Sequence, residues 1–177
     1  MIELRRWTDD DEPLLRVTVG DAFMMTHLGG PETSEMMAAR HVRFRDWRGD
    51  GGMFTIWVST ESVAVGTVGL WDSAWCGDDV YETGWMVLPA FARRGFATAA
   101  AREIVARAAR LREHRFLMAL PAVDNVASNG VCAGAGFTNL GEYEIEYPPG
   151  TAMRAHAWRV DLVAIRAEAR AAVTRGK

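Results

Sequence analysis

The stretch from residue 80 to residue 120 limits the fold of this chain more than any other part. A strand-like run, Val80–Leu88, ends at Pro89, and a second short apolar run follows at Phe116–Leu120. Between them, residues 95–112 repeat small and aliphatic side chains at the spacing of one helix face. Two neighbouring strands joined through a helix typically run parallel. Parallel strands need a long crossover connection, whereas a short turn can join antiparallel strands. The segment therefore predicts one parallel strand pair.

The rest of the chain is typical of an antiparallel sheet with helices around it. No internal repeat, low-complexity tract or linker interrupts it. Residues 72–79 are expected to form a polar loop. The expected strands and helices make the fold class mixed α/β, and a chain of 177 residues predicts a single domain, residues 1–177. We expect further strands at residues 1–7, 53–60, 63–71, 137–147 and 153–163, and further helices at 8–19, 32–47, 125–135 and after 163.

Charge and cysteine content exclude several classes of function. The 20 basic and 23 acidic residues give a net charge of −3, so no strongly basic surface is implied for a nucleic acid. Two cysteines are too few for a disulfide framework. The start of the chain lacks the apolar stretch of a signal peptide, and no apolar run approaches the roughly 18 residues of a membrane span. We expect a cytoplasmic protein without a membrane partner. The four histidines lack metal-ligand spacing, so no metal is expected.

A short basic loop leads into the long helix. Arg93 and Arg94 precede Gly95, and the helix begins there. The first turn of a helix has unpaired N–H groups and a partial positive charge. Glycine lets a ligand approach the backbone closely, so the loop is a candidate cradle for a phosphate or pyrophosphate. The alternative is an ordinary strand-to-helix connection with exposed arginines.

Two motifs in this region resemble a known family. Residues Ala92–Ala97 are similar to the acetyl-CoA loop of the GNAT superfamily of N-acetyltransferases, Gln/Arg-x-x-Gly-x-Gly/Ala. Gly95 and Ala97 match this motif, whereas Ala92 departs from it at the first position. Downstream, Asn125-x-x-Ser128-Asn129 followed by Gly136-Phe137 is similar to a segment of the RimJ/RimL-like branch of the superfamily.

The resemblance implies a GNAT-like fold in which the two parallel strands splay apart and receive the pantetheine arm of acetyl-CoA, the expected co-substrate. Backbone groups after residue 85 would pair with this arm, and amides of the long helix's first turn would hold the pyrophosphate. The implied cofactor-binding residues are Met86, Val87, Leu88, Arg93, Arg94, Gly95, Phe96, Ala97, Thr98, Asn125 and Ser128.

Acetyl transfer to an amine needs a base, because a typical alkylamine has a pKa of about 10. Glu82 lies where the family often places an acid, and a carboxylate acting through water can serve as the base. The alternative for Glu82 is an acid on the solvated face of the sheet. Asp78 and Asp79 are weaker candidates. A backbone N–H near Val87 would meet the oxyanion.

The acid for the leaving thiolate is where this chain departs from the family. Many members carry a tyrosine at the position that Cys132 occupies here, seven residues after Asn125. A thiol can donate a proton, yet a buried cysteine is usually inert packing. The thiolate can also leave unaided. In the family, the region that Phe23–Leu28 represents here lines the acceptor pocket.

Together these features predict an N-acetyltransferase that moves acetyl to a primary amine by direct attack in a ternary complex. The acceptor is a small molecule or a protein N-terminus, between which the sequence does not decide. Two other classes stay open: a GNAT-shaped module that binds CoA without turnover, and a binder of a different phosphate ligand. Family members are often dimers, so a homodimer is a further state to test.

Overall fold

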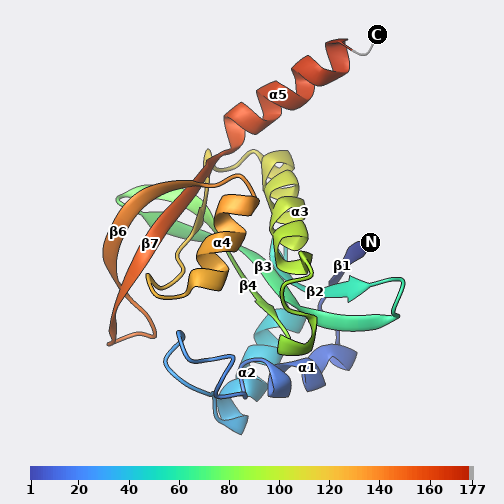
Figure 1. Cartoon of the computed structure of the whole chain (residues 1–177), viewed down its shortest axis with the longest axis vertical. Coiled ribbons are helices and arrows are strands. Elements are labelled where there is room, and N and C mark those ends of the chain that lie inside the picture. Colours follow the sequence, from blue (N-terminus) through green and yellow to red (C-terminus); the bar gives the residue numbers. More distant parts are fainter. Residues whose placement is uncertain (176–177) are drawn as a thin grey trace.

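A seven-stranded sheet organises the protein, whose computed structural model describes residues 1–175 (Figure 1). Within this part the strand order is β1-β2-β3-β4-β5-β7-β6. Only the β4–β5 pair among these neighbours is parallel. The expected mixed α/β fold is confirmed; the expected domain end at Lys177 lies outside the described residues. The strands are β1 (Ile2–Arg6), β2 (Gly52–Val58), β3 (Val63–Trp75), β4 (Asp78–Val87), β5 (Phe116–Ala119), β6 (Thr138–Glu146) and β7 (Ala152–Asp161).

The helices cover both faces of the sheet. On one face, α3 packs on a core that includes Phe54, Leu70, Tyr81 and Leu117, and α4 joins the same core; we call this the α3 face. On the other face, α1 and α2 enclose a second core with Met86; we call this the Glu82 face, since Glu82 and Met86 alternate in step along β4. The helices are η1 (Asp9–Asp11), α1 (Glu12–Val17), α2 (Ser34–Arg45), η2 (Pro89–Phe91), α3 (Phe96–Leu111), α4 (Val126–Gly134) and α5 (Leu162–Arg175).

The helices α1 and α2 lie at one end of the molecule, and α5 extends from the other (Figure 1). The first turn of α5 is anchored, because Leu162 is fully buried and Ile165 packs on the main core. Arg166 donates from Nη1 to the carbonyl oxygen of Ala109 at 3.3 Å, which ties α5 to α3. No helix among residues 1–175 is long and apolar enough to cross a membrane.

The β3–β4 hairpin is longer than expected. Residues 72–79 were predicted to form a loop, but β3 continues to Trp75 and β4 begins at Asp78, in register with it. The connecting turn is Cys76-Gly77, with φ of 52° and 89°. Two consecutive residues with positive φ match the right-handed twist of a hairpin, so a two-residue turn can close the strands here. The prediction was wrong because the backbone of residues 72–75 pairs with residues 78–81 although the segment is polar.

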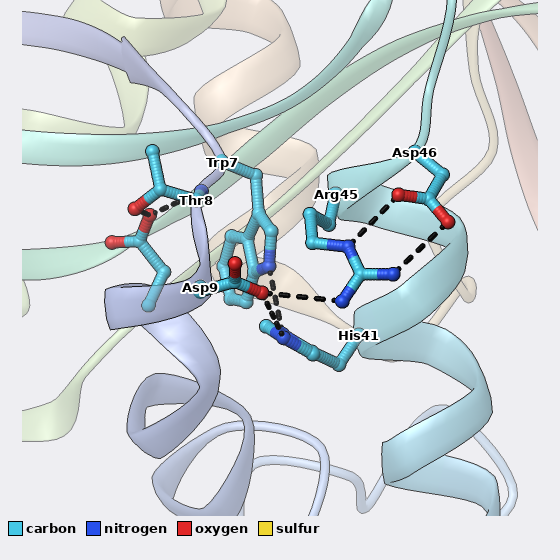
Figure 2. Close-up of polar contacts among 7 residues, drawn as sticks. Trp7, Thr8, Asp9, His41, Arg45 and Asp46 are labelled. Atoms are coloured by element: carbon cyan, nitrogen blue, oxygen red, sulfur yellow. Dashed lines mark hydrogen bonds and ion pairs between the residues drawn. The ribbon is translucent and has the colours of Figure 1, made fainter.

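A polar network fastens α2 to the end of β1 (Figure 2). Trp7 Nε1 donates to His41 Nδ1 at 3.2 Å, and His41 Nε2 lies 3.3 Å from Asp9 Oδ1. Arg45 bridges Asp9 and Asp46. The Trp7 ring also packs edge-on against Phe44, at 5.4 Å between centroids. The network holds the C-terminal half of α2 in place beneath the Glu82 face.

Candidate active site

One edge of β4 has no partner strand over most of its length. The parallel pairing with β5 covers only Tyr81 and Glu82, and no strand among residues 1–175 pairs with that edge beyond them. Leu88 N–H donates to Val65 O at 2.9 Å, so Leu88 faces β3. Backbone groups of a strand point alternately to its two neighbours. The N–H and C=O groups of Trp85 and Val87 therefore face the unpaired side, which we call the free edge of β4.

This alternation decides which of the three residues expected to pair with pantetheine present their backbone groups to the free edge. Among the three expected residues, Val87 presents its amide to the free edge, whereas Met86 and Leu88 point theirs at β3. Trp85, which was not singled out, presents its backbone on the same side as Val87. Strand alternation counted from Pro89 is the signal that could have found it. A ligand pairing here would meet Trp85 and Val87.

The first turn of α3 begins at Gly95. Gly95 has φ +81°, and its carbonyl accepts the first helical hydrogen bond, from Ala99 N–H at 2.9 Å. No side chain caps the turn, so the amides of Phe96, Ala97 and Thr98 have no intrahelical partner. A Cβ placed on Gly95 would meet no atom within 4 Å, so the space before the turn is open. These residues fit an anionic group such as a pyrophosphate.

The two arginines before Gly95 differ in their surroundings. The Arg94 guanidinium forms an ion pair with Glu61 and lies 4.8 Å above the Phe96 ring. The hydrogen bond with Glu61 raises the pKa of Arg94 further above its usual value. Arg93 is exposed, with φ +61°. Arg94 therefore braces the loop against the β2–β3 turn, and Arg93 is the arginine whose side chain is directed to solvent.

The loop between β5 and α4 is held by two asparagines. Asn125 Oδ1 accepts from Ser128 N–H at 3.0 Å and caps α4. Asn129 lies in the same motif but had no expected role. Its side-chain Nδ2 donates to the carbonyls of Ala122 and Asn125 at 2.9 and 2.8 Å. Its Oδ1 accepts from Trp158 Nε1 at 2.8 Å. The side chains of Asn125 and Asn129 thus shape the loop from within.

Helix α4 packs closely on the first turn of α3. A Cβ on Gly134 would lie 3.1 Å from Thr98 Cγ2, so glycine permits this approach. Arg102 of α3 donates from Nε and Nη2 to Gly134 O at 3.1 and 2.6 Å. Cys132 of α4 is 0% exposed within the main core. Burial raises the pKa of its thiol to about 12, so the thiol keeps its proton at neutral pH.

Glu82 occupies the last paired position before the free edge begins. It lies opposite Trp71 of β3 and opposite Met118 of β5, and Ser73 Oγ donates to its Oε2 at 2.8 Å. Burial raises the pKa of Glu82, and hydrogen bonds from Ser73 and Trp71 counteract only part of this effect. A partly buried carboxylate with a raised pKa is a stronger proton acceptor than an exposed one.

The loop between α1 and α2 reaches over the Glu82 face. His27 Nδ1 lies 3.0 Å from Asp124 Oδ1, in the loop before α4. A Cβ on Gly29 would lie 2.6 Å from Pro148 Cδ, in the β6–β7 turn. Phe23 is 75% exposed in the same loop. The loop, which includes Phe23–Leu28, thus touches the β5–α4 loop and the β6–β7 turn.

A cavity of about 230 Å³ lies elsewhere, between the α2–β2 loop and the C-terminal end of α3. Tyr81 and Glu113 are among its lining residues, and Tyr81 donates its hydroxyl to Glu113 at 3.2 Å. Neither Glu82 nor the first turn of α3 lines it. We therefore place the candidate active site at the free edge of β4. Within the described part of the chain, no three metal-ligating side chains gather.

Comparison with known proteins agrees with this architecture. The family model described as the acetyltransferase (GNAT) domain matches residues 2–138. The chain belongs to this GNAT acetyltransferase family. No curated protein matches the chain by sequence.

Solved structures share the fold at low sequence identity. A GNAT-family acetyltransferase from Bacillus anthracis matches with a TM-score of 0.76 and 18% identity, over 91% of this chain and 95% of that one. Spermidine N-acetyltransferase from Vibrio cholerae, in complex with CoA and spermine, matches with a TM-score of 0.74 and 13% identity, over 92% and 96%. Aminoglycoside acetyltransferase AAC(6')-Ib, in complex with coenzyme A, matches with a TM-score of 0.72 and 14% identity, over 91% and 95%. These similarities show the fold.

Proposed function

We propose that this protein, as one domain, transfers an acetyl group from acetyl-CoA to the primary amine of a small molecule or a protein N-terminus. The observation that carries the proposal is the free edge of β4 combined with the uncapped first turn of α3. An extended amide-bearing arm can pair with the first, and a diphosphate can bind the second. Similar folds hold CoA in the structures named above. Acetyl-CoA, when bound, supplies the reactive thioester.

The cofactor contacts we assign follow from the geometry. Trp85 N–H and C=O pair with the pantetheine arm, while Phe96, Ala97 and Thr98 donate their amides to the pyrophosphate. Arg93 adds a cation beside them, and Asn125 and Ser128 meet the arm from α4. Val87 N–H meets the negative charge that develops on the acetyl oxygen, a contribution of about 3 kcal/mol for a well-aimed donor.

Glu82 is the proposed base. The amine nitrogen bonds to the acetyl carbon as the carbon–sulfur bond breaks, and Glu82 takes an amine proton, directly or through water. The raised pKa of Glu82 suits this role, because a base works best when its pKa approaches the ambient pH. Direct attack in a ternary complex follows, since no covalent enzyme intermediate is needed.

Two routes return a proton to the departing thiolate. Cys132 stands where many family members have tyrosine, and its thiol carries a proton at neutral pH. It is fully buried, however, and would reach the thiolate only after local movement. The second route takes the proton from the amine or from solvent. We propose the second as the main route and keep Cys132 as the side chain to test.

The finer assignments also belong to the proposal. The segment Asn125-x-x-Ser128 with Gly136-Phe137 supports the RimJ/RimL-like branch. Membership of that branch favours a protein N-terminus as the acceptor. The structures of similar fold are named for aminoglycoside and spermidine acetylation, which supports a small amine. A reducing, cytoplasmic setting fits two free cysteines. A homodimer is the oligomeric state to test first.

A CoA-binding module without turnover is the second candidate. Ala92 departs from the family loop, and Cys132 replaces its tyrosine. Calorimetric titration with acetyl-CoA, followed by thiol release with a panel of amines, separates the two. Binding with release supports the enzyme, whereas binding without release from any amine supports the module. Absence of acetyl-CoA binding would contradict both and leave a different phosphate ligand.

Gly95→Asp tests the pyrophosphate contact directly. The carboxylate adds negative charge where the diphosphate would bind, so acetyl-CoA binding should be abolished. Gly77→Asp is the matched control, because Gly77 has φ +89° and open space around its Cα but lies in the distant hairpin turn. Calorimetry on both variants checks the prediction. Near-wild-type affinity in Gly95→Asp would refute the assignment.

A further inference from the structure

Three aromatic side chains lie on the same face of the sheet as Glu82. Trp71 lies opposite Glu82 in the β3–β4 register, and Trp75 lies two positions beyond Ser73 on the same side of β3. Trp75 packs edge-on against Tyr143 of β6, at 5.1 Å between ring centroids and 73° between planes. Tyr143 is 38% exposed. We call Trp71, Trp75 and Tyr143 the aromatic wall.

Two glycines seat the indole of Trp71. A Cβ on Gly69 would lie 2.6 Å from Cζ3 of Trp71, and a Cβ on Gly84 would lie 3.3 Å from its Cη2. The indole therefore lies across the backbone of β3 and β4, where any larger residue would displace it. This position puts the ring next to the Glu82 carboxylate, which Ser73 also holds. The ring is partly exposed and can contact a ligand.

Few strand residues on this face are charged. In β6, Glu142 pairs with His156 and Glu144 with Arg154, which places these carboxylates on the α3 face. Asp72 is likewise on the α3 face and lies 3.0 Å from His114.

Along β3 to β7, three carboxylates share the side of Glu82, counting Glu82 itself. Asp78 is at the end of the hairpin, and Asp161 is bound to Arg115. Arg159 adds a cation on this side, stacked 4.4 Å from the Phe116 ring. On these strands a polycation would find one well-placed carboxylate, that of Glu82, and an opposing guanidinium.

We infer that the acceptor is a small primary monoamine with a flat aromatic body, bound by the aromatic wall with its nitrogen at Glu82. This inference rests on the proposed function. The ammonium form is attracted to the face of Trp71 before Glu82 takes its proton, and the apolar body packs on Trp75 and Tyr143. Polyamines and aminoglycosides, whose recognition needs several carboxylates, are then poor acceptors.

The test compares 2-phenylethylamine with spermidine in thiol release. We expect kcat/KM to be at least about tenfold higher for 2-phenylethylamine. Trp71→Leu keeps an apolar cover over the two glycines but removes the ring, and should lower kcat/KM for 2-phenylethylamine about tenfold, with less than about twofold change for spermidine. Trp57→Leu is the matched control: Trp57 lies on β2 under Arg5, outside the aromatic wall, and its loss should change neither value.

Trp75→Leu serves as the second variant if Trp71→Leu does not fold, and circular dichroism checks both. Equilibrium dialysis of 2-phenylethylamine without acetyl-CoA gives a readout that needs no turnover. Trp71-dependent binding without thiol release from any amine would contradict the proposed function and support only the class of amine that binds at the aromatic wall. Turnover that prefers spermidine, or a peptide N-terminus, would overturn the acceptor class and leave the proposed function intact.

Discussion

At the scale of the residue, Glu82 makes the sharpest prediction. A base works in its deprotonated form, so turnover should rise with pH through the pKa of Glu82, which burial places above 4.5. Glu82→Gln should lower kcat about 100-fold, remove this acid limb and leave acetyl-CoA affinity unchanged. A pH profile of kcat checks it. Asp79→Asn is the control, because Asp79 is exposed and lies on the α3 face. An unchanged profile in Glu82→Gln would remove Glu82 as the base.

The same substitution has a consequence for stability. Burial raises the pKa of Glu82 in the folded state, so the protonated side chain stabilises the folded protein at low pH. This stabilisation is lost as the pH rises through the folded pKa. Glu82→Gln should therefore raise Tm at pH 8 and leave it near the wild-type value at pH 4. Thermal unfolding at the two pH values measures this. A lower Tm at pH 8 would mean that the hydrogen bonds of Glu82 outweigh its burial.

The two cysteines should react at different rates. Cys76 is exposed in the hairpin turn, while Cys132 is buried and its pKa is raised to about 12. Thiolate is the reactive form, so a disulfide reagent should modify Cys76 alone in the native protein and reach Cys132 only on unfolding. Cys76→Ser isolates the slow thiol. Rapid modification of Cys132 in that variant would show that α4 opens readily.

Some site residues could be predicted from the sequence, and others could not. Gly95 carries a local signal, a glycine that opens a helix, whereas Glu82 was a candidate because of the family resemblance. The Arg94–Glu61 ion pair joins residues 33 positions apart, and the seat of Trp71 depends on which β3 residue faces Gly84. Such contacts depend on register, which the sequence of a single strand does not contain.

At the scale of the element, α4 offers a matched pair of glycines. Gly130 has nothing within 4 Å of an added Cβ, whereas Gly134 is close to Thr98. Gly130→Ala should stabilise the protein by about 0.5–1 kcal/mol through helix propensity. Gly134→Leu should push α4 away from the first turn of α3 and weaken acetyl-CoA binding. Urea unfolding and calorimetry measure the two effects. Equal affinities in both variants would show that α4 does not support that turn.

The β3–β4 hairpin shows where sequence patterns stop being informative. The polar residues from 72 to 79 resemble a loop, yet they alternate across a two-residue turn and extend both strands. A half-exposed hairpin end has weak hydrophobic periodicity, so its register is set by the turn and by pairing rather than by composition. Helix α3 was predictable within a residue because one of its faces is continuously buried.

At the scale of the whole molecule, the free edge of β4 should couple ligand binding to stability. A ligand that binds only the folded state adds about 2.7 kcal/mol at a concentration of 100 Kd. Acetyl-CoA should therefore raise Tm, and hydrogen exchange should slow at Trp85 and Val87. Gly95→Asp should lose both effects. Protection confined to the first turn of α3 would show that the pantetheine arm does not pair with β4.

The single parallel pair followed from the order of elements, since a helix between two strands allows a parallel crossover. The curvature of the sheet did not follow. Trp75 of β3 touches Tyr143 of β6 although three strands lie between them in the sheet. The twist of a sheet is the sum of small rotations between neighbouring strands, and no local sequence pattern predicts its total.

Unpaired N–H and C=O groups on an exposed edge strand usually promote aggregation, because strands of other chains can pair with them. In this protein the vacancy is interior: β5 continues the sheet beside it, and α3 and α4 overlie one side. A foreign strand would need to enter along its own axis, between two strands that remain fastened at Tyr81 and Glu82. The unpaired N–H and C=O groups at the free edge of β4 are therefore accessible to a narrow, extended ligand but not to a strand of another protein's sheet.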